Sequence, residues 1–260
     1  MPTAPPQPSP TDARPLALIT GGAVRVGRAV CLELARAGCD IRFTYRTRER
    51  EALALRDELA SLGVSAECDP LELDDLAAVE LYGQRLATET PRVDVLIHNA
   101  SIYAPTPLAT VTADDLLRNY RVNAAAPLLL TRALAARLAQ SPLPGGGSVV
   151  AFSDMHVLGR PRRDFSAYAM SKAALTEMVR VLAVDLAPHV RVNAVAPGVV
   201  AFPDSGYESD PEMQARYLQR VPLKRAGTPE DAAKAVRWLA LEATYVTGEI
   251  VRLDGGRWLA

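Results

Sequence analysis

The sequence has little cysteine and no long apolar run. Its 260 residues include 3 cysteines, Cys31, Cys39 and Cys68, without a CxxC pair or a Cys/His cluster around them. This spacing excludes a disulfide framework and a structural zinc site, and it favours a reducing, cytoplasmic compartment. No uninterrupted apolar stretch approaches the about 18 residues of a membrane span. We therefore expect neither a bound metal nor a membrane partner.

An excess of charge of one sign is also missing. The 29 Lys and Arg residues balance 30 Asp and Glu residues, the formal net charge is -1, and like charges form no block. A surface built to hold nucleic acid or an anionic membrane is therefore not expected. With 49% hydrophobic and 23% charged residues, the composition is that of one soluble globular domain. Electrostatics does not identify the partner, and the expectation of a small-molecule substrate rests on the motifs of the chain.

The N-terminal end reads differently from the rest of the chain. Residues 1–15 are rich in proline and lack the apolar core of a signal peptide. We expect them to form a disordered tail, followed by a single folded domain over residues 16–260.

Within that domain, short apolar runs alternate with longer segments of helical period, which predicts an α/β fold. The predicted strands are Leu16–Thr20, Asp40–Tyr45, Val64–Cys68, Val93–Asn99, Ser148–Ser153, Arg191–Ala196 and Ile250–Leu253. The predicted helices are Arg25–Ala37, Arg48–Leu62, Leu73–Glu89, Asp114–Gln140, Ser166–Leu186 and Pro229–Glu242. This alternation predicts one doubly wound, Rossmann-type domain whose seven-stranded parallel sheet is flanked by helices.

Two irregular segments deserve a separate prediction. Pro127 interrupts the fourth helix, which predicts a bend just before it, near Asn123. Residues 199–222 show no clear element and follow the sixth strand, on the carboxyl side of the sheet where such folds bind ligands. We interpret them as a substrate lid.

The first strand leads into the turn TGGAVRVG, residues 20–27, which opens a helix. Glycines at such a turn let the backbone approach a pyrophosphate, whose charge the helix N-terminus favours. A plain tight turn is the alternative reading of this motif alone.

The end of the second strand predicts which dinucleotide binds. NAD binders carry an acidic residue there, whereas this chain has Tyr45, Arg46 and Thr47. With Arg25, these residues offer donors to a 2′-phosphate, so the sequence predicts NADPH rather than NADH. The alternative is that Arg46 and Arg48 are solvated charges at the start of a helix.

Two further strand ends carry candidate cofactor residues. Asp69 follows the third strand and is a candidate acceptor for the adenine amino group, or else a turn or cap residue. Asn99, Ala100 and Ser101 close the fourth strand, where small residues let a cofactor lie against the backbone.

Tyr168 and Lys172 are four residues apart at the start of a predicted helix, so both project from one face. A nearby ammonium favours tyrosinate and is expected to lower the pKa of the tyrosine. The pair is a plausible acid/base device for proton transfer.

Taken together, these motifs resemble the short-chain dehydrogenases/reductases from about Leu16 to the C-terminus. The matching features include Asn123, Asn193 through Pro197 and Gly198, and the closing Leu253-Asp-Gly-Gly256. The resemblance implies that Tyr168 donates a proton, that Lys172 also holds the nicotinamide ribose and that Asn123 supports a proton-relay water. The expected cofactor contacts are Gly21, Arg25, Val26, Tyr45, Arg46, Thr47, Asp69, Asn99, Ala100, Ser101, Tyr168, Lys172, Pro197 and Gly198.

Where this sequence departs from the common pattern of the family, it is similar to the sequences of pteridine and dihydromonapterin reductases. Arg25 stands where most of the family has glycine, and Asp154 stands near the usual catalytic serine. The interval from Asp154 to Tyr168 is one residue longer than is usual in the family. Asp154 is the favoured catalytic residue, with Ser153 as its rival and Met155 as a further alternative if the strand slips.

The same resemblance implies a substrate site. Ser101 and Tyr103 match the residues that hold the pterin, and Asp154 and Tyr168 complete the expected substrate set. The basic loop with Arg160, Arg162 and Arg163 is either a charged surface or an attractor for an anionic substrate tail, and we favour the former.

The resulting hypothesis is an NADPH-dependent reductase of a dihydropterin, such as dihydromonapterin or dihydrobiopterin, or of dihydrofolate. A carbonyl reductase of the 3-oxoacyl-carrier-protein reductase type is the alternative. A non-catalytic NADPH sensor is a third possibility, which the set of Asn123, Tyr168 and Lys172 disfavours. Relatives of this kind are commonly homotetramers, so we expect a homo-oligomer.

Overall fold

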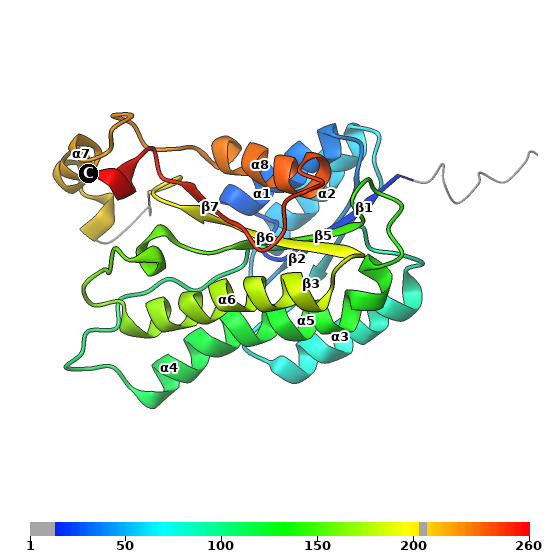
Figure 1. Cartoon of the computed structure of the whole chain (residues 1–260), viewed down its shortest axis with the longest axis horizontal. Coiled ribbons are helices and arrows are strands. Elements are labelled where there is room, and N and C mark those ends of the chain that lie inside the picture. The colour runs from blue at the N-terminus through cyan, green and yellow to red at the C-terminus, as the bar shows by residue number, and fades with distance from the viewer. Residues whose placement is uncertain (1–13, 203–206) are drawn as a thin grey trace, which may run out of the picture.

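The structure is a computed structural model, and it describes residues 14–202 and 207–260. Within these residues, seven strands form one parallel sheet in the order β3-β2-β1-β4-β5-β6-β7 (Figure 1). The strands are β1 (Leu16–Ile19), β2 (Asp40–Tyr45), β3 (Ala66–Pro70), β4 (Val95–His98), β5 (Gly147–Phe152), β6 (Val190–Pro197) and β7 (Ile250–Leu253). This is the predicted doubly wound, Rossmann-type sheet.

Helices cover both faces of the sheet. They are α1 (Arg25–Arg36), α2 (Glu49–Ser61), α3 (Leu76–Glu89), α4 (Ala113–Tyr120), α5 (Ala126–Leu138), α6 (Ser166–Asp185), α7 (Pro211–Gln219) and α8 (Pro229–Arg237). Figure 1 shows α1 and α8 on one face and α3, α5 and α6 on the other. Each face buries its own apolar core, with Phe43 and Leu34 in one and Leu96 and Leu134 in the other. None of the helices in the described ranges has the length and apolarity that crossing a membrane requires.

The predicted fourth helix is interrupted near Asn123, the place where a bend was predicted. The predicted helix over residues 114–140 is divided into α4, a π-helical turn η1 (Arg121–Ala125) and α5. Pro127 stands in the first turn of α5 and has no N–H to donate to the carbonyl four residues earlier, that of Asn123. The N–H of Ala126 reaches back five residues to the carbonyl of Arg121 instead, which widens the turn.

Helix α7 lies in the segment that we read as a lid without elements. Residues 207–209 form the 3₁₀ turn η3 (Tyr207–Ser209), and α7 follows it directly. The carboxylate of Asp210 accepts hydrogen bonds from the backbone N–H groups of Glu212 and Met213, and Pro211 occupies the first helical turn. The Asp-Pro pair is thus a helix-start signal that the sequence analysis missed. Residues 203–206 of the predicted lid, and residues 1–13 of the predicted tail, lie outside the described part of the chain.

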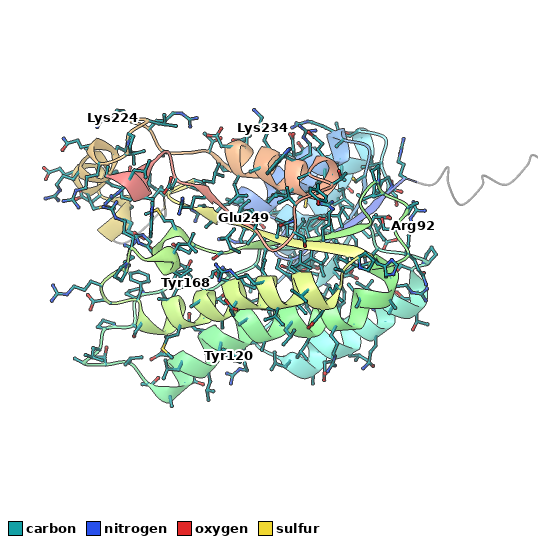
Figure 2. All side chains as sticks on the ribbon, viewed as in Figure 1. Arg92, Tyr120, Tyr168, Lys224, Lys234 and Glu249 are labelled. Carbon is teal, nitrogen blue, oxygen red and sulfur yellow. The ribbon has the colours of Figure 1, made fainter. Side chains whose placement is uncertain are left out.

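Asp94, just before β4, ties three segments together at the amino end of the sheet. Its fully buried carboxylate accepts hydrogen bonds from the backbone N–H of Leu16 at 2.7 Å, from Nε of Arg92 at 3.0 Å and from Oγ of Ser141 at 2.6 Å. Arg92 lies at the opposite end of the molecule from Tyr168 (Figure 2). This junction therefore supports the sheet far from the predicted catalytic residues.

We expect Asp94→Ala to lower the free energy of unfolding by about 3 kcal/mol, because three donors lose a charged acceptor in a place that water does not reach. Urea denaturation measures the change. Asp185→Ala, which removes an exposed carboxylate at the end of α6, is the control and should change stability by less than about 0.5 kcal/mol. A similar small change in both variants would contradict a structural role for Asp94.

Candidate active site

A cleft with a cavity volume of about 680 Å³ opens at the carboxyl ends of the strands. It brings together most of the predicted site residues from six separate segments of the chain. The predicted residues that line it are Gly21, Arg25, Val26, Tyr45, Arg46, Thr47, Asn99, Ala100, Ser101, Tyr103, Asp154, Tyr168, Lys172, Pro197 and Gly198. Asp69 and Asn123 are the two predicted residues that do not line it.

The glycine turn meets the cleft at the start of α1. Gly21 has a φ of +68°, and a Cβ on Gly27 would come within 2.1 Å of the carbonyl oxygen of Gly21, so this turn requires glycine. The N-cap residue Val24 supplies no side-chain hydrogen bond, and the first turn of α1 holds no acidic residue. The N–H groups at this helix start therefore have no side-chain cap, as a site for a pyrophosphate requires.

Arg25 adopts a left-handed backbone conformation with a φ of +52°. This explains why glycine is common at this position, since a side chain is disfavoured there. The Nη2 group of Arg25 donates hydrogen bonds to the carbonyl oxygens of Ala201 at 3.0 Å and Phe202 at 3.1 Å. The guanidinium thus reaches the segment after β6, and not the Tyr45–Thr47 end where we expected it to assist with a 2′-phosphate.

The end of β2 carries no carboxylate. Tyr45, Arg46, Thr47 and Arg48 line the cleft there, facing residues 71–73 that follow β3. The Arg46 side chain is half exposed, and its Nε lies 4.0 Å from a carboxylate oxygen of Glu72. An exposed guanidinium beside a threonine hydroxyl is a suitable donor set for a phosphate monoester.

Asp69 does not reach the cleft. It lies within β3, where its carboxylate accepts hydrogen bonds from Arg42 at 2.8 and 3.3 Å, from Oη of Tyr82 at 3.0 Å and from Arg85 at 3.1 Å. Although burial opposes ionisation, these donors hold the pKa of Asp69 below its ordinary value. Its carboxylate joins β2, β3 and α3, so a contact with adenine would have to replace one of these bonds.

Asn99 fastens the glycine turn to the end of β4. Its Nδ2 donates to the carbonyl oxygens of Thr20 at 3.0 Å and Gly21 at 2.9 Å. The hydroxyl of Thr20 in turn accepts hydrogen bonds from the backbone N–H groups of Asn99 and Ala100, each at 3.1 Å. The turn and the strand end are therefore held as one unit before any ligand arrives.

Asp154, and not Ser153, contacts the tyrosine. The hydroxyl of Tyr168 donates a hydrogen bond of 2.7 Å to Oδ2 of Asp154, and Oδ1 accepts one of 2.7 Å from the backbone N–H of His156. Ser153 is buried, with its Oγ 2.5 Å from Oγ1 of Thr176. Met155 is fully buried as well. All but Met155 line the cleft, and of the three candidates it is Asp154 that hydrogen-bonds Tyr168, whereas Ser153 is bonded to Thr176.

Lys172 lies beneath Tyr168 and is only 3% exposed. Its Nζ donates to the carbonyl oxygen of Phe152 at 2.6 Å and lies 5.9 Å from the centre of the Tyr168 ring. Burial lowers the pKa of Lys172 to about 8, and the charge of Asp154 opposes this effect.

The expectation that Lys172 lowers the pKa of Tyr168 is wrong for this structure. Burial, and next the charge of Asp154, raise the pKa of Tyr168 well above its ordinary value. Both effects disfavour tyrosinate, because the anion would be desolvated and would face a carboxylate. Tyr168 is therefore protonated at neutral pH and can serve as a proton donor.

Asn123 acts on the cleft through the loop after β4. Its Oδ1 accepts hydrogen bonds from Oγ of Ser101 and from the backbone N–H of Ile102, both at 3.0 Å. Its Nδ2 donates to the carbonyl oxygen of Ile102 at 3.1 Å and to Oγ of Ser171 at 2.9 Å. The buried amide is fully used in holding this loop to α6, so a relay water would have to contact backbone groups of the π-helical turn rather than this side chain.

An aromatic wall borders the substrate end. The rings of Tyr103 and Phe165 are stacked with centres 4.8 Å apart, and Tyr103 meets Tyr168 edge to face at 5.0 Å. The sequence analysis identified Tyr103 but missed Phe165, Glu208 and Tyr217. Glu208 and Tyr217 also line the cleft. Phe165 lies three residues before Tyr168, which was a usable signal, whereas nothing local in the sequence indicates that the segment after β6 returns to the cleft.

Among residues 14–202 and 207–260, no three His, Cys, Asp or Glu side chains gather as a metal site requires. The cleft offers the hydrogen-bonded Tyr168–Asp154 pair, the buried Lys172 and the uncapped start of α1 as groups that can bind or transfer protons.

Comparisons with known proteins find relatives over nearly the whole chain. A family model described as enoyl-(acyl carrier protein) reductase matches residues 22–257. The granaticin polyketide synthase putative ketoacyl reductase 2 of Streptomyces violaceoruber is 36% identical over 260 residues, covering 96% of this chain and 99% of that protein. The glucose 1-dehydrogenase of Gluconobacter oxydans is 30% identical over 246 residues, covering 92% and 90%.

Solved structures are similar over nearly the whole chain. A blue fluorescent protein from a metagenomic library, in complex with NADPH, has a TM-score of 0.84 and 32% identity, covering 94% of this chain and 97% of that one. A putative NAD(P)-dependent gluconate 5-dehydrogenase from Beutenbergia cavernae, with bound NADP, has a TM-score of 0.86 and 34% identity, covering 96% and 98%.

The low pKa of Lys172 predicts a pH-dependent stability of the protein without ligands. Because its folded-state pKa of about 8 lies below the ordinary 10.5, the unfolded chain binds more protons between these values. The stability of the wild type relative to Lys172→Met should then be constant below pH 8 and rise by about 3 kcal/mol as the pH increases toward 10.5. Urea denaturation of both proteins over a pH series measures this difference, and a difference independent of pH would contradict the burial of an ionisable amine.

Proposed function

This chain belongs to the short-chain dehydrogenase/reductase superfamily, and on that premise we propose that it is an NADPH-dependent oxidoreductase that reduces the ring of a dihydropterin, carried by a free pterin or by dihydrofolate. The proteins named above are dehydrogenases and ketoacyl reductases. The pterin substrate is therefore argued from the residues of this cleft.

The cleft fits the cofactor at both ends. The uncapped start of α1 and the glycine turn would hold the pyrophosphate, and Arg46 with Thr47 would hold the 2′-phosphate. Lys172 would hold the nicotinamide ribose at the centre. Bound NADPH supplies a hydride, and the chain has to supply the proton and the orientation.

The observation that carries the pterin proposal is the carboxylate of Asp154, which accepts the Tyr168 hydrogen bond at 2.7 Å. A carboxylate is an acceptor only, so it binds the N–H and amino groups of an aminopyrimidine ring and repels the lone pairs of a ketone oxygen. The serine hydroxyl usual in the superfamily could donate to a ketone. A heterocycle that carries donors is the substrate class that suits this cleft.

The aromatic wall supports the same proposal. A flat heterocycle can stack on aromatic rings with a gain of about 0.5 to 1.5 kcal/mol beyond area burial. Tyr103 lies beside Tyr168 and is 40% exposed at the cleft, so it offers such a surface.

Proton delivery follows from the protonation of the tyrosine. Reduction of a C=N bond adds a hydride to carbon and a proton to nitrogen. Tyr168 holds its proton at neutral pH because burial and Asp154 raise its pKa, so it can donate that proton once the substrate nitrogen becomes basic. The half-buried Asp154 connects Tyr168 to the open cleft, by which the proton can be replaced.

A second candidate is reduction of a ketone on an acyl chain. It is favoured by the 36% identity to a putative ketoacyl reductase. Assays of NADPH oxidation with dihydromonapterin, dihydrofolate and an acetoacetyl thioester, run in parallel, separate the two. Turnover of the thioester alone would refute the pterin proposal and leave the fold and the Tyr168 chemistry in place.

We further propose that the chain forms a homo-oligomer, and a homotetramer is the assembly that its relatives commonly form. Leu117, Tyr120, Leu128, Val181 and Val184 are exposed apolar residues on α4, α5 and α6. Tyr120 lies on the outer side of this helical layer, away from the sheet (Figure 2). A helical face of this kind suits contact with a second copy.

Asp154→Ser should reduce turnover of a dihydropterin by about 100-fold, because the acceptor for the ring donors is lost, and should preserve or increase reduction of the acetoacetyl thioester. Asp154→Asn, which keeps the shape and removes the charge, is the matched variant. Values of kcat/KM for both substrates measure the effect, and an unchanged pterin activity in the serine variant would contradict the assignment.

Tyr168→Phe should lower kcat by about 100-fold or more, because the proton donor is removed. The affinity for NADPH, measured by fluorescence titration, should be largely retained. Turnover equal to that of the wild type would exclude Tyr168 as the donor.

A further inference from the structure

Three loops meet at the substrate end of the cleft and enclose a pair of opposite charges. Arg162 comes from the loop after β5, Glu208 from η3 after β6, and Tyr103 from the loop after β4. Nη2 of Arg162 forms an ion pair with Oε1 of Glu208, and the hydroxyl of Tyr103 donates to the same oxygen at 3.2 Å. All three side chains line the cleft that contains Tyr168 and Asp154.

The Arg162–Glu208 ion pair is separated from Tyr168 by the ring of Tyr103. The guanidinium carbon of Arg162 is 4.4 Å from the centre of the Phe165 ring and 5.6 Å from that of Tyr103, and Tyr103 contacts Tyr168. The Arg162 and Glu208 side chains are only 27% and 18% exposed. Partial exclusion of water makes this pair less screened than a surface pair.

The basic loop after β5 offers the cleft a single arginine. Arg160 donates to the backbone carbonyl of Arg257, and Arg163 is exposed without lining the cleft. Arg162 is therefore the loop's one cation at the substrate end, and Glu208 already neutralises it.

Of the other Arg and Lys side chains that line the described part of the cleft, Arg46 and Arg48 follow β2 at the cofactor end, and Arg25 and Lys172 are hydrogen-bonded to backbone. Nη2 of Arg25 binds the carbonyl oxygens of residues 201 and 202, and Lys172 binds that of Phe152. A substrate tail that extends past Tyr103 thus meets the carboxylate of Glu208, and the nearby cation, Arg162, is already paired with that carboxylate.

We propose that Glu208 determines the charge of the tail that a pterin substrate can carry: it favours a neutral, hydroxylated side chain and disfavours an anionic one such as the glutamate of dihydrofolate. The inference rests on the proposed function. A carboxylate accepts hydrogen bonds from hydroxyl groups, which suits a polyhydroxylated tail. Glu208 repels an anionic tail, and such a tail can reach Arg162 only by displacing the Glu208 carboxylate. The site therefore discriminates against anionic tails by electrostatic repulsion.

The test compares two substrates that share a ring and differ in tail charge, dihydrofolate and dihydromonapterin. For the NADPH-dependent reaction of the full chain, we expect Glu208→Gln to raise the ratio of their kcat/KM values in favour of dihydrofolate by about tenfold, which corresponds to about 1.4 kcal/mol. The gain should lie in KM, and it should shrink at high salt because it comes from a freed guanidinium.

Two further proteins make the result specific. In Glu208→Gln combined with Arg162→Met the gain should disappear, since no cation remains to attract the tail. Glu212→Gln removes the same charge from an exposed position on α7 that does not line the cleft, and it should leave the ratio at the wild-type value. Calorimetric titration of the NADP⁺-loaded proteins with dihydrofolate gives the same comparison as dissociation constants, without turnover.

The outcomes separate the two proposals. A wild type that reduces neither pterin overturns the proposed function and this inference with it. A wild type that reduces both, with an unchanged ratio in Glu208→Gln or with a gain that persists in the double variant, overturns the role of Glu208 alone.

Discussion

The reversal of strand order between β1 and β4 is the constraint on which the cleft depends. Beyond β1 the sheet continues through β2 and β3, and beyond β4 it continues through β5, β6 and β7. The connections that leave β1 and β4 must therefore diverge to opposite faces of the sheet, which opens a crevice at their carboxyl ends. The glycine turn and the start of α6, which carries Tyr168 and Lys172, line this crevice, so the topology brings them together.

Two asparagines convert this crevice into a fixed site. Asn99 joins the glycine turn to β4, and Asn123 joins the loop after β4 to α6 through Ser171. The buried Asn123 side chain is fully hydrogen-bonded within the protein, as buried polar groups have to be, and Nδ2 of Asn99 makes two hydrogen bonds to the glycine turn. Because these bonds do not involve a ligand, the walls of the cleft are in place before binding, and less conformational entropy is lost when a ligand enters.

Sequence patterns predicted what depends on periodicity and on local backbone chemistry: the seven strands, the sheet and an irregularity of the fourth helix near Asn123, before Pro127. They did not predict what depends on neighbours distant in the chain. The carboxylate of Asp69 is occupied by partners on other elements, and burial and the charge of Asp154 raise the pKa of Tyr168. Neither effect has a sequence signature, since burial exists only once the chain is packed.

The contacts at the substrate end also bear on how this protein folds. Tyr103 is paired with Glu208 across 105 positions, a wider separation than the 79 and 78 positions between Asn99 and the glycine turn. A contact of wider separation closes a longer loop, and it needs both of its partners to have been synthesised. A chain still emerging from the ribosome could complete the cofactor turn early, yet it could not assemble the substrate end until β6 and the segment beyond it had joined the sheet. For this protein, substrate recognition is a property of the finished chain.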